Sequence, residues 1–191
     1  MFLQSEFEQS YLQSLKEQDL SISHPNSGEK ETSLERTISA MQDGVDVIYQ
    51  ASLKSGVWQG RSDFLFKVEK PSNLGAWSYE VIDSKLAKET RTGTILQLCL
   101  YSQMISEIQG VIPEFMHVIT PEDGFSKHTY RLDDFLAYYR LIKSRLEKTV
   151  LNATEKIPTY PIPCAHCEIC NWWQHCDTRR RSDDHLSLVA G

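Results

Sequence analysis

Apolar residues recur with helical spacing in the first part of the chain. They return every four positions over residues 3–17, which is the pattern of an amphipathic helix. A second helical stretch starts at Thr32 and Glu35, which have the spacing of a capping box, and ends at Gly44. We therefore expect two amphipathic helices before the first long strand.

Three strand-length runs come next, at residues 45–53, 57–66 and 79–86. Each is rich in aromatic and β-branched residues, which favour strands. The turn at 54–56 joins the first two runs closely. The loop at 70–75 contains Pro and Gly and is typical of a connection between antiparallel neighbours.

The second half of the chain returns to an alternation of helix and strand. Residues 94–109 are apolar almost all round the first turns, as in a helix packed on a sheet. A strand is expected at 111–119, an edge strand at 127–131 and an amphipathic helix at 132–151. This order by itself predicts an α/β or an α+β fold with a mixed central sheet flanked by helices.

The composition is that of a globular protein. The chain has 191 residues, 40% of them apolar, which suits one domain with a substantial core. It contains no run of about 20 apolar residues and no leader-like start, so we expect no membrane partner and a cytoplasmic location. A formal net charge of −6 disfavours nucleic-acid binding over the whole surface, although local basic groups such as Lys85 and Arg91 could follow a phosphate backbone.

Charged side chains interrupt the apolar strands. Asp63 lies in the second run, and Asp83 and Lys85 share one face of the third run because side chains alternate along a strand. Ionised groups in an apolar strand are costly unless they are paired or bound to a metal. Gln97 and Tyr101 are four residues apart on one face of the following helix, so we expect their polar ends to reach these charges.

These segments occur in a recognisable order. GRSD, then EVIDSK, then a glutamine and a tyrosine four residues apart, resembles the RecB-type branch of the PD-(D/E)XK nucleases, and in particular its iron–sulfur members. Those members include CRISPR adaptation nucleases, AddB-type nuclease domains and RecB-like putative nucleases. The resemblance implies an α/β fold with a restriction-endonuclease-like core at residues 1–160. It also implies a Mg²⁺- or Mn²⁺-dependent deoxyribonuclease, an exonuclease on DNA ends or single strands that serves DNA repair or recombination.

The resemblance also assigns roles to individual residues. The catalytic residues that it implies are Asp63, Asp83, Lys85, Gln97 and Tyr101. The metal ligands that it implies are Glu8, Asp63, Asp83 and the backbone carbonyl of Ser84. Lys85 would orient the attacking water or stabilise the transition state, and Gln97 and Tyr101 would position Lys85 and the DNA backbone. Glu8 would come from the first helix, and a solvated surface glutamate is the open alternative.

A cysteine cluster lies near the C-terminus, with the spacing C-x2-C-x2-C-x5-C. Its members are Cys164, Cys167, Cys170 and Cys176. A reducing cytosol argues against disulfides, so bound metal is the leading explanation. Thiolates suit either Zn²⁺ or an iron–sulfur cluster. The resemblance favours a 4Fe-4S cluster, whose fourth ligand is Cys164 or a cysteine upstream of the given chain.

Residues 161–191 form this cysteine region and a tail. We expect the chain to stop short of a further domain, such as a helicase or RNase H-like domain. A different interpretation is a non-catalytic module with a nuclease fold that binds DNA or protein and is stapled by the metal cluster, and a third is a zinc-stabilised regulatory domain. The presence of all the motif residues favours the enzyme.

Overall fold

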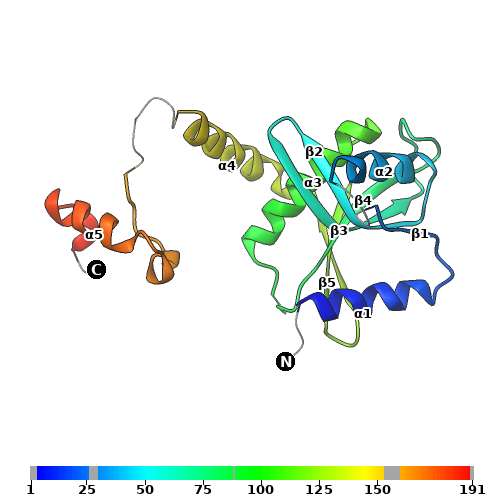
Figure 1. The fold of residues 1–191 in the computed structure, drawn as a ribbon, viewed down its shortest axis with the longest axis horizontal. Coiled ribbons are helices and arrows are strands. Elements are labelled where there is room, and N and C mark those ends of the chain that lie inside the picture. The colour runs from blue at the N-terminus through cyan, green and yellow to red at the C-terminus, as the bar shows by residue number, and fades with distance from the viewer. Residues whose placement is uncertain (1–3, 26–29, 88, 153–159, 190–191) are drawn as a thin grey trace. The chain divides into compact units, whose positions relative to one another are not determined.

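The computed structural model describes residues 4–25, 30–87, 89–152 and 160–189. The chain divides into two compact units, Met1–Leu141 and Ile142–Gly191. The first unit is an α/β domain whose mixed six-stranded sheet is flanked by helices (Figure 1). The predicted fold class is therefore confirmed at this level.

The six strands lie in the sheet in the order of the sequence. They are β1 (Ile22–Ser23), β2 (Val47–Ser55), β3 (Trp58–Val68), β4 (Ser78–Ser84), β5 (Phe115–Thr120) and β6 (Ser126–Arg131). β2, β3 and β4 are antiparallel neighbours, as the turn-rich loop at 70–75 predicts. β4 and β5 are parallel, so the long connection that contains helix α3 (Thr92–Gln109) crosses from one end of the sheet to the other.

Helices cover both faces of the sheet in this unit. Helix α1 (Gln4–Lys16) packs on one face, here called the α1 face, through Phe7, Tyr11, Leu12 and Leu15. Helices α2 (Lys30–Gln42), α3 and the start of α4 (Asp133–Asn152) pack on the other, here called the α3 face. Neighbouring strand residues divide between the two: Phe64 and Ile82 belong to the α1 face, and Leu65 and Val81 to the α3 face.

β2 changes face in the middle of the strand. Tyr49 packs on the α1 face, but Ala51 and Leu53 pack on the α3 face, although residues two apart in a regular strand share a face. The residue at the change is Gln50, whose φ of 55° is left-handed. The pairing with β3 keeps the same register on both sides of Gln50, so this irregularity is a local change of backbone conformation and not a β-bulge, and it lies opposite Asp63.

The expected elements are confirmed to within a few residues, with three differences. The strand expected at 111–119 begins only at Phe115, because Gly110 ends α3 in a left-handed conformation and Pro113 has no N–H for a ladder. β1 has two residues, too few for a periodic pattern, and forms by pairing Ile22 with Val47. Helix α5 (Trp173–Ser182) was not expected, since its residues lack an apolar stripe.

The second unit contains two short 3-10 helices, η2 (Ala165–Ile169) and η3 (Leu186–Leu188), in addition to α5. Of residues 142–150 and 160–189, whose side chains the structure describes, only Arg180 is buried. No helix in the described parts of the chain is both long enough and apolar enough to cross a bilayer.

Gly60 provides a test of the packing between β3 and α3. A Cβ atom at this position would lie 2.6 Å from Cε1 of Tyr101, which is closer than real Cβ contacts allow. We expect Gly60→Ala to lower the free energy of unfolding by about 1–3 kcal/mol, because either the ring or the strand must shift. Urea denaturation measures this effect.

Gly93→Ala is the matched control, since a Cβ at this helical position meets nothing within 4 Å. It should leave the unfolding free energy unchanged or raise it, because alanine favours helix. Adding Tyr101→Ala to Gly60→Ala should recover the part of the loss that comes from the clash. Additive losses in the double variant would show that the two residues do not oppose each other.

Candidate functional site

Asp63 and Asp83 lie opposite each other at the point where the ladder between β3 and β4 ends. The last pair of that ladder is Phe64 with Ile82, and its register continues to Asp63 and Asp83. Oδ2 of Asp63 accepts hydrogen bonds from the backbone N–H and from the hydroxyl of Ser84, both at 2.8 Å. The Asp63 side chain therefore bridges the two strands where their backbone pairing stops.

The carboxylate of Asp83 is buried, and its negative charge is only partly offset by neighbouring groups. Only 1% of the residue is exposed, and Oδ1 has no hydrogen-bond partner within the described residues. The other oxygen, Oδ2, forms an ion pair with Lys85, whose Nζ lies 2.6 Å away. Burial and then the nearby negative charge of Asp63 raise the pKa of Asp83 to about 6, despite the ammonium group of Lys85.

This acid pair fits a hard divalent cation. Mg²⁺ and Mn²⁺ prefer carboxylate oxygens and commonly bind through one or two of them, with water in the remaining positions. A buried carboxylate with free acceptor capacity beside a second carboxylate supplies that donor set. No group of three or more His, Cys, Asp or Glu side chains that could hold a metal occurs in the described chain.

The Ser84 carbonyl, expected as a metal ligand, already has a partner. Gln4 Nε2 donates to it at 2.5 Å, and the Oε1 of the same amide accepts from the N–H of Leu86 at 3.1 Å. The N–H of Lys85 donates to the Ile119 carbonyl of β5 at 2.9 Å. The backbone around Lys85 is thus held by α1 on one side and by β5 on the other, which fixes the origin of the Lys85 side chain. No pattern in the sequence pointed to a role for Gln4.

Glu8 approaches the acid pair from α1. Its carboxylate accepts a hydrogen bond from Gln50 Nε2 and makes another with the Tyr49 hydroxyl. Burial raises the pKa of Glu8, and the charge of Asp63 adds to this shift. The carboxylates of Glu8 and Asp63 are therefore close enough for electrostatic repulsion, but Glu8 does not form a three-ligand group with the two aspartates in the described structure. Glu8 is half-buried and hydrogen-bonded, and its role as a metal ligand stays a prediction.

Gln97 and Tyr101 form a pair of their own. Gln97 Nε2 donates to the Tyr101 hydroxyl at 3.2 Å, as their helical spacing predicts. The Tyr101 ring packs over Gly60, three residues before Asp63 and about 10 Å from it along the strand. Neither residue has a hydrogen bond to Asp63, Asp83 or Lys85 within the part of the chain that the structure describes.

A second buried acid lies on the same strand but belongs to a separate network. Glu80 bonds to His117 Nε2 at 2.9 Å, and His117 Nδ1 lies 3.0 Å from the Thr129 hydroxyl. The N–H of Phe115 donates to the other Glu80 oxygen at 3.1 Å. All these contacts tie β4, β5 and β6 together. Because Glu80 is compensated in this way, it lacks the free acceptor capacity of Asp83.

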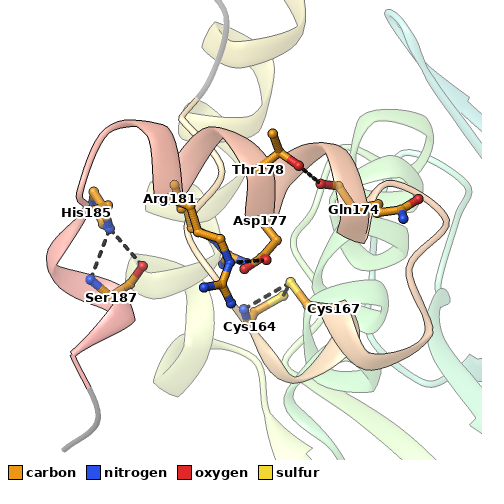
Figure 2. A network of polar contacts seen from close by, with 9 residues as sticks. Cys164, Cys167, Gln174, Asp177, Thr178, Arg181, His185 and Ser187 are labelled. Carbon is orange, nitrogen blue, oxygen red and sulfur yellow. Dashed lines mark hydrogen bonds and ion pairs between the residues drawn. The ribbon is translucent and has the colours of Figure 1, made fainter.

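Two of the four cysteines of the second unit, Cys164 and Cys167, lie next to each other. Cys164 Sγ is 3.9 Å from Cys167 Sγ, and the backbone N–H of Cys164 points to that same sulfur (Figure 2). All four thiols are free, and they do not form a three-ligand group in the described structure. Cys99 is buried in the core of the first unit, as expected for a packing residue.

The free-energy cost of burying the Asp83 charge can be measured from the pH dependence of stability in the metal-free protein. Its pKa is higher in the folded state than the ordinary 3.8 of an unfolded chain, so the folded protein binds the proton more tightly. Stability from this group is therefore present at low pH and is lost as the pH rises from about 4 to above 6, by up to about 3 kcal/mol. Asp83→Asn should raise the melting temperature at pH 7 in the presence of a chelator, with little difference at pH 4.

Asp46→Asn is a control of opposite sign. Its hydrogen bond with Lys67, followed by those with Ser21, lowers the pKa of Asp46 to about 2. This aspartate stabilises the fold above pH 4, and that contribution is lost as the pH falls towards 2, so Asp46→Asn should lower the melting temperature at pH 7. A fall for Asp83→Asn as well would show that the Asp83 charge is well compensated in the metal-free protein.

Comparison with known proteins does not assign the chain to a family. No protein-family model matches the chain, and no curated protein matches it either. Any function for the site therefore has to be argued from its own residues.

Proposed function

We propose that this protein is a metal-dependent nuclease that hydrolyses phosphodiester bonds of DNA. The observation that carries the proposal is the meeting of Asp63, Asp83 and Lys85 at one point of the sheet, where the Asp83 carboxylate is buried and keeps free acceptor capacity. These residues also stand in the order that resembles the RecB-type nucleases. The finer classification of the first unit as a restriction-endonuclease-like core is part of the same proposal.

Each residue of the site has a role in this chemistry. Asp63 and Asp83 would hold Mg²⁺ or Mn²⁺, and the bound cation would supply an acidified water and neutralise charge on the scissile phosphate. The Lys85 ammonium is fixed beside Asp83 and can orient that water or stabilise the negative charge of the transition state. Glu8 would assist in holding the cation, either directly or through water. Gln97 and Tyr101 can bind the DNA backbone, away from Lys85.

The proposed substrate is DNA with free ends or single strands. The arginines of α5 add little to a phosphate-binding surface, because each lies within 4 Å of an aspartate. Arg179 pairs with Asp183, Arg180 pairs with Asp177, and Arg181 also pairs with Asp177, as Figure 2 shows. Binding would therefore depend on the metal and on the few lysines and arginines near the site. With a net charge of −6, we expect weak affinity for long duplexes.

A metal at the cysteines would explain how the second unit folds. Its described part buries only Arg180, so it lacks the apolar core that normally stabilises a fold. Small units of this kind usually need disulfides or a structural metal. We propose a 4Fe-4S cluster on Cys164, Cys167, Cys170 and Cys176, with Zn²⁺ as the alternative, in a protein of the cytoplasm.

A non-catalytic module that binds DNA or protein is the second candidate. It is favoured by the small number of acidic ligands, since among the residues that the structure describes two carboxylates and no third acidic ligand meet at the site, and by the contact of Gln4 with the Ser84 carbonyl. The two candidates differ in one measurable property, which is Mg²⁺-dependent bond cleavage.

End-labelled single-stranded DNA provides the decisive assay. We expect degradation with Mg²⁺ or Mn²⁺ that stops on chelation, is absent in Asp83→Ala, and falls about 10²–10³-fold in Lys85→Ala. Lys54→Ala is the matched control, because Lys54 is an exposed lysine of the same sheet. DNA binding without cleavage by the wild-type protein would support the module instead.

Metal analysis after anaerobic purification tests the cysteine site. We expect iron and sulfide, with a brown chromophore, and loss of both in Cys164→Ser and Cys170→Ser but not in Cys99→Ala. Colourless protein with one zinc per chain would favour Zn²⁺. Retention of full iron content in Cys164→Ser would exclude Cys164 as a ligand.

A further inference from the structure

We infer that Gln50 is a positioning residue that holds the Glu8 carboxylate beside Asp63, by means of a left-handed backbone in the middle of β2. The inference rests on the proposed function, since it assigns a role in metal binding to a residue outside the acid pair. Four observations carry it: the backbone of Gln50, its place in the register, the change of face of β2, and its contact with Glu8.

The backbone of Gln50 is unusual for its residue type. Its φ of 55° lies in the left-handed region, which glycine adopts freely and which asparagine tolerates better than glutamine. Such a residue inside a strand persists only where the surrounding structure fixes it, and residues of this kind cluster at functional sites. The strand continues normally on both sides, from Val47 to Ser55.

The register places this distortion beside the acid pair. Tyr49 pairs with Phe64 and Ala51 pairs with Ser62, so Gln50 stands opposite Asp63. β3 changes face in the same region, since Gly60 faces Tyr101 of α3 whereas Phe64 packs on the α1 face. Both strands are therefore irregular beside Asp63, whose carboxylate accepts a hydrogen bond from the N–H of Ser84.

The distortion allows two consecutive side chains to reach one carboxylate. In a regular strand Tyr49 and Gln50 would point to opposite faces of the sheet. Here Tyr49 lies on the α1 face and Gln50 Nε2 also donates to Glu8 Oε1 from α1, while the Tyr49 hydroxyl makes a second bond with Glu8. Gln9 Nε2 donates to the same hydroxyl at 2.7 Å. Two side chains of β2, Tyr49 and Gln50, thus hold Glu8, and Gln9 of the same helix as Glu8 orients the Tyr49 hydroxyl.

Held in this way, Glu8 can act on a cation through a bound water. Partners that orient such groups typically change metal affinity about 10–100-fold when they are removed. A residue that served only to twist the strand would be replaceable by glycine without loss, because glycine adopts the same backbone at lower cost. Substitution by glycine therefore separates the two roles.

The experiment compares Mn²⁺ binding and thermal stability in the full chain. Gln50→Gly should melt at the temperature of the wild type or above it, yet bind Mn²⁺ about tenfold more weakly. Gln50→Asn, which tolerates the left-handed backbone but is one methylene too short for Glu8, should show the same weakening. In a Glu8→Ala background, Gln50→Gly should cause no further loss.

Three outcomes are informative. Wild-type Mn²⁺ affinity in Gln50→Gly would overturn the role of Gln50. An equal further loss in the Glu8→Ala background would also overturn it, because Gln50 would then act without Glu8. If the wild type and Asp83→Asn bind Mn²⁺ equally, or not at all, the proposed function itself fails, and this result is read from proteins in which Gln50 is unchanged.

Discussion

The burial of the Asp83 carboxylate is the constraint that the rest of the site depends on. A negative charge at a strand end with 1% exposure is costly, and the neighbouring Asp63 increases that cost. One ammonium group, that of Lys85, offsets it only in part. The negative charge of Asp83 is therefore only partly offset by the protein, and the proposed divalent cation would offset it further.

The surrounding structure fixes the positions of the residues next to Asp83. Asp63 is fixed by two bonds from Ser84, and the backbone around Lys85 is held by Gln4 and by β5. None of these contacts neutralises Asp83. Natural proteins commonly retain a destabilising arrangement of this kind where function requires it, because a preorganised site loses less on binding than one that must first assemble.

The two units achieve order by different physical means. The first buries apolar side chains on both faces of a sheet, whereas the described part of the second buries only Arg180, which lies over the Trp173 ring with Asp177 at 3.5 Å. Ion pairs near the surface add little stability. If the four cysteines bind the proposed metal, its binding free energy would stabilise this unit where its described residues bury no apolar core.

The sequence by itself determined the long helices and strands of the first unit, the fold class and the local part of the site. Helices and strands followed from periodicity, and the same-face placement of Asp83 and Lys85 followed from the alternation of side chains, as did the Gln97–Tyr101 bond from helical spacing. The tertiary structure alone decided which distant residues meet. Register sets Asp63 against Asp83, a left-handed Gln50 turns towards Glu8, and Tyr101 packs on Gly60. Such contacts depend on strand pairing and backbone irregularity, which no local pattern encodes.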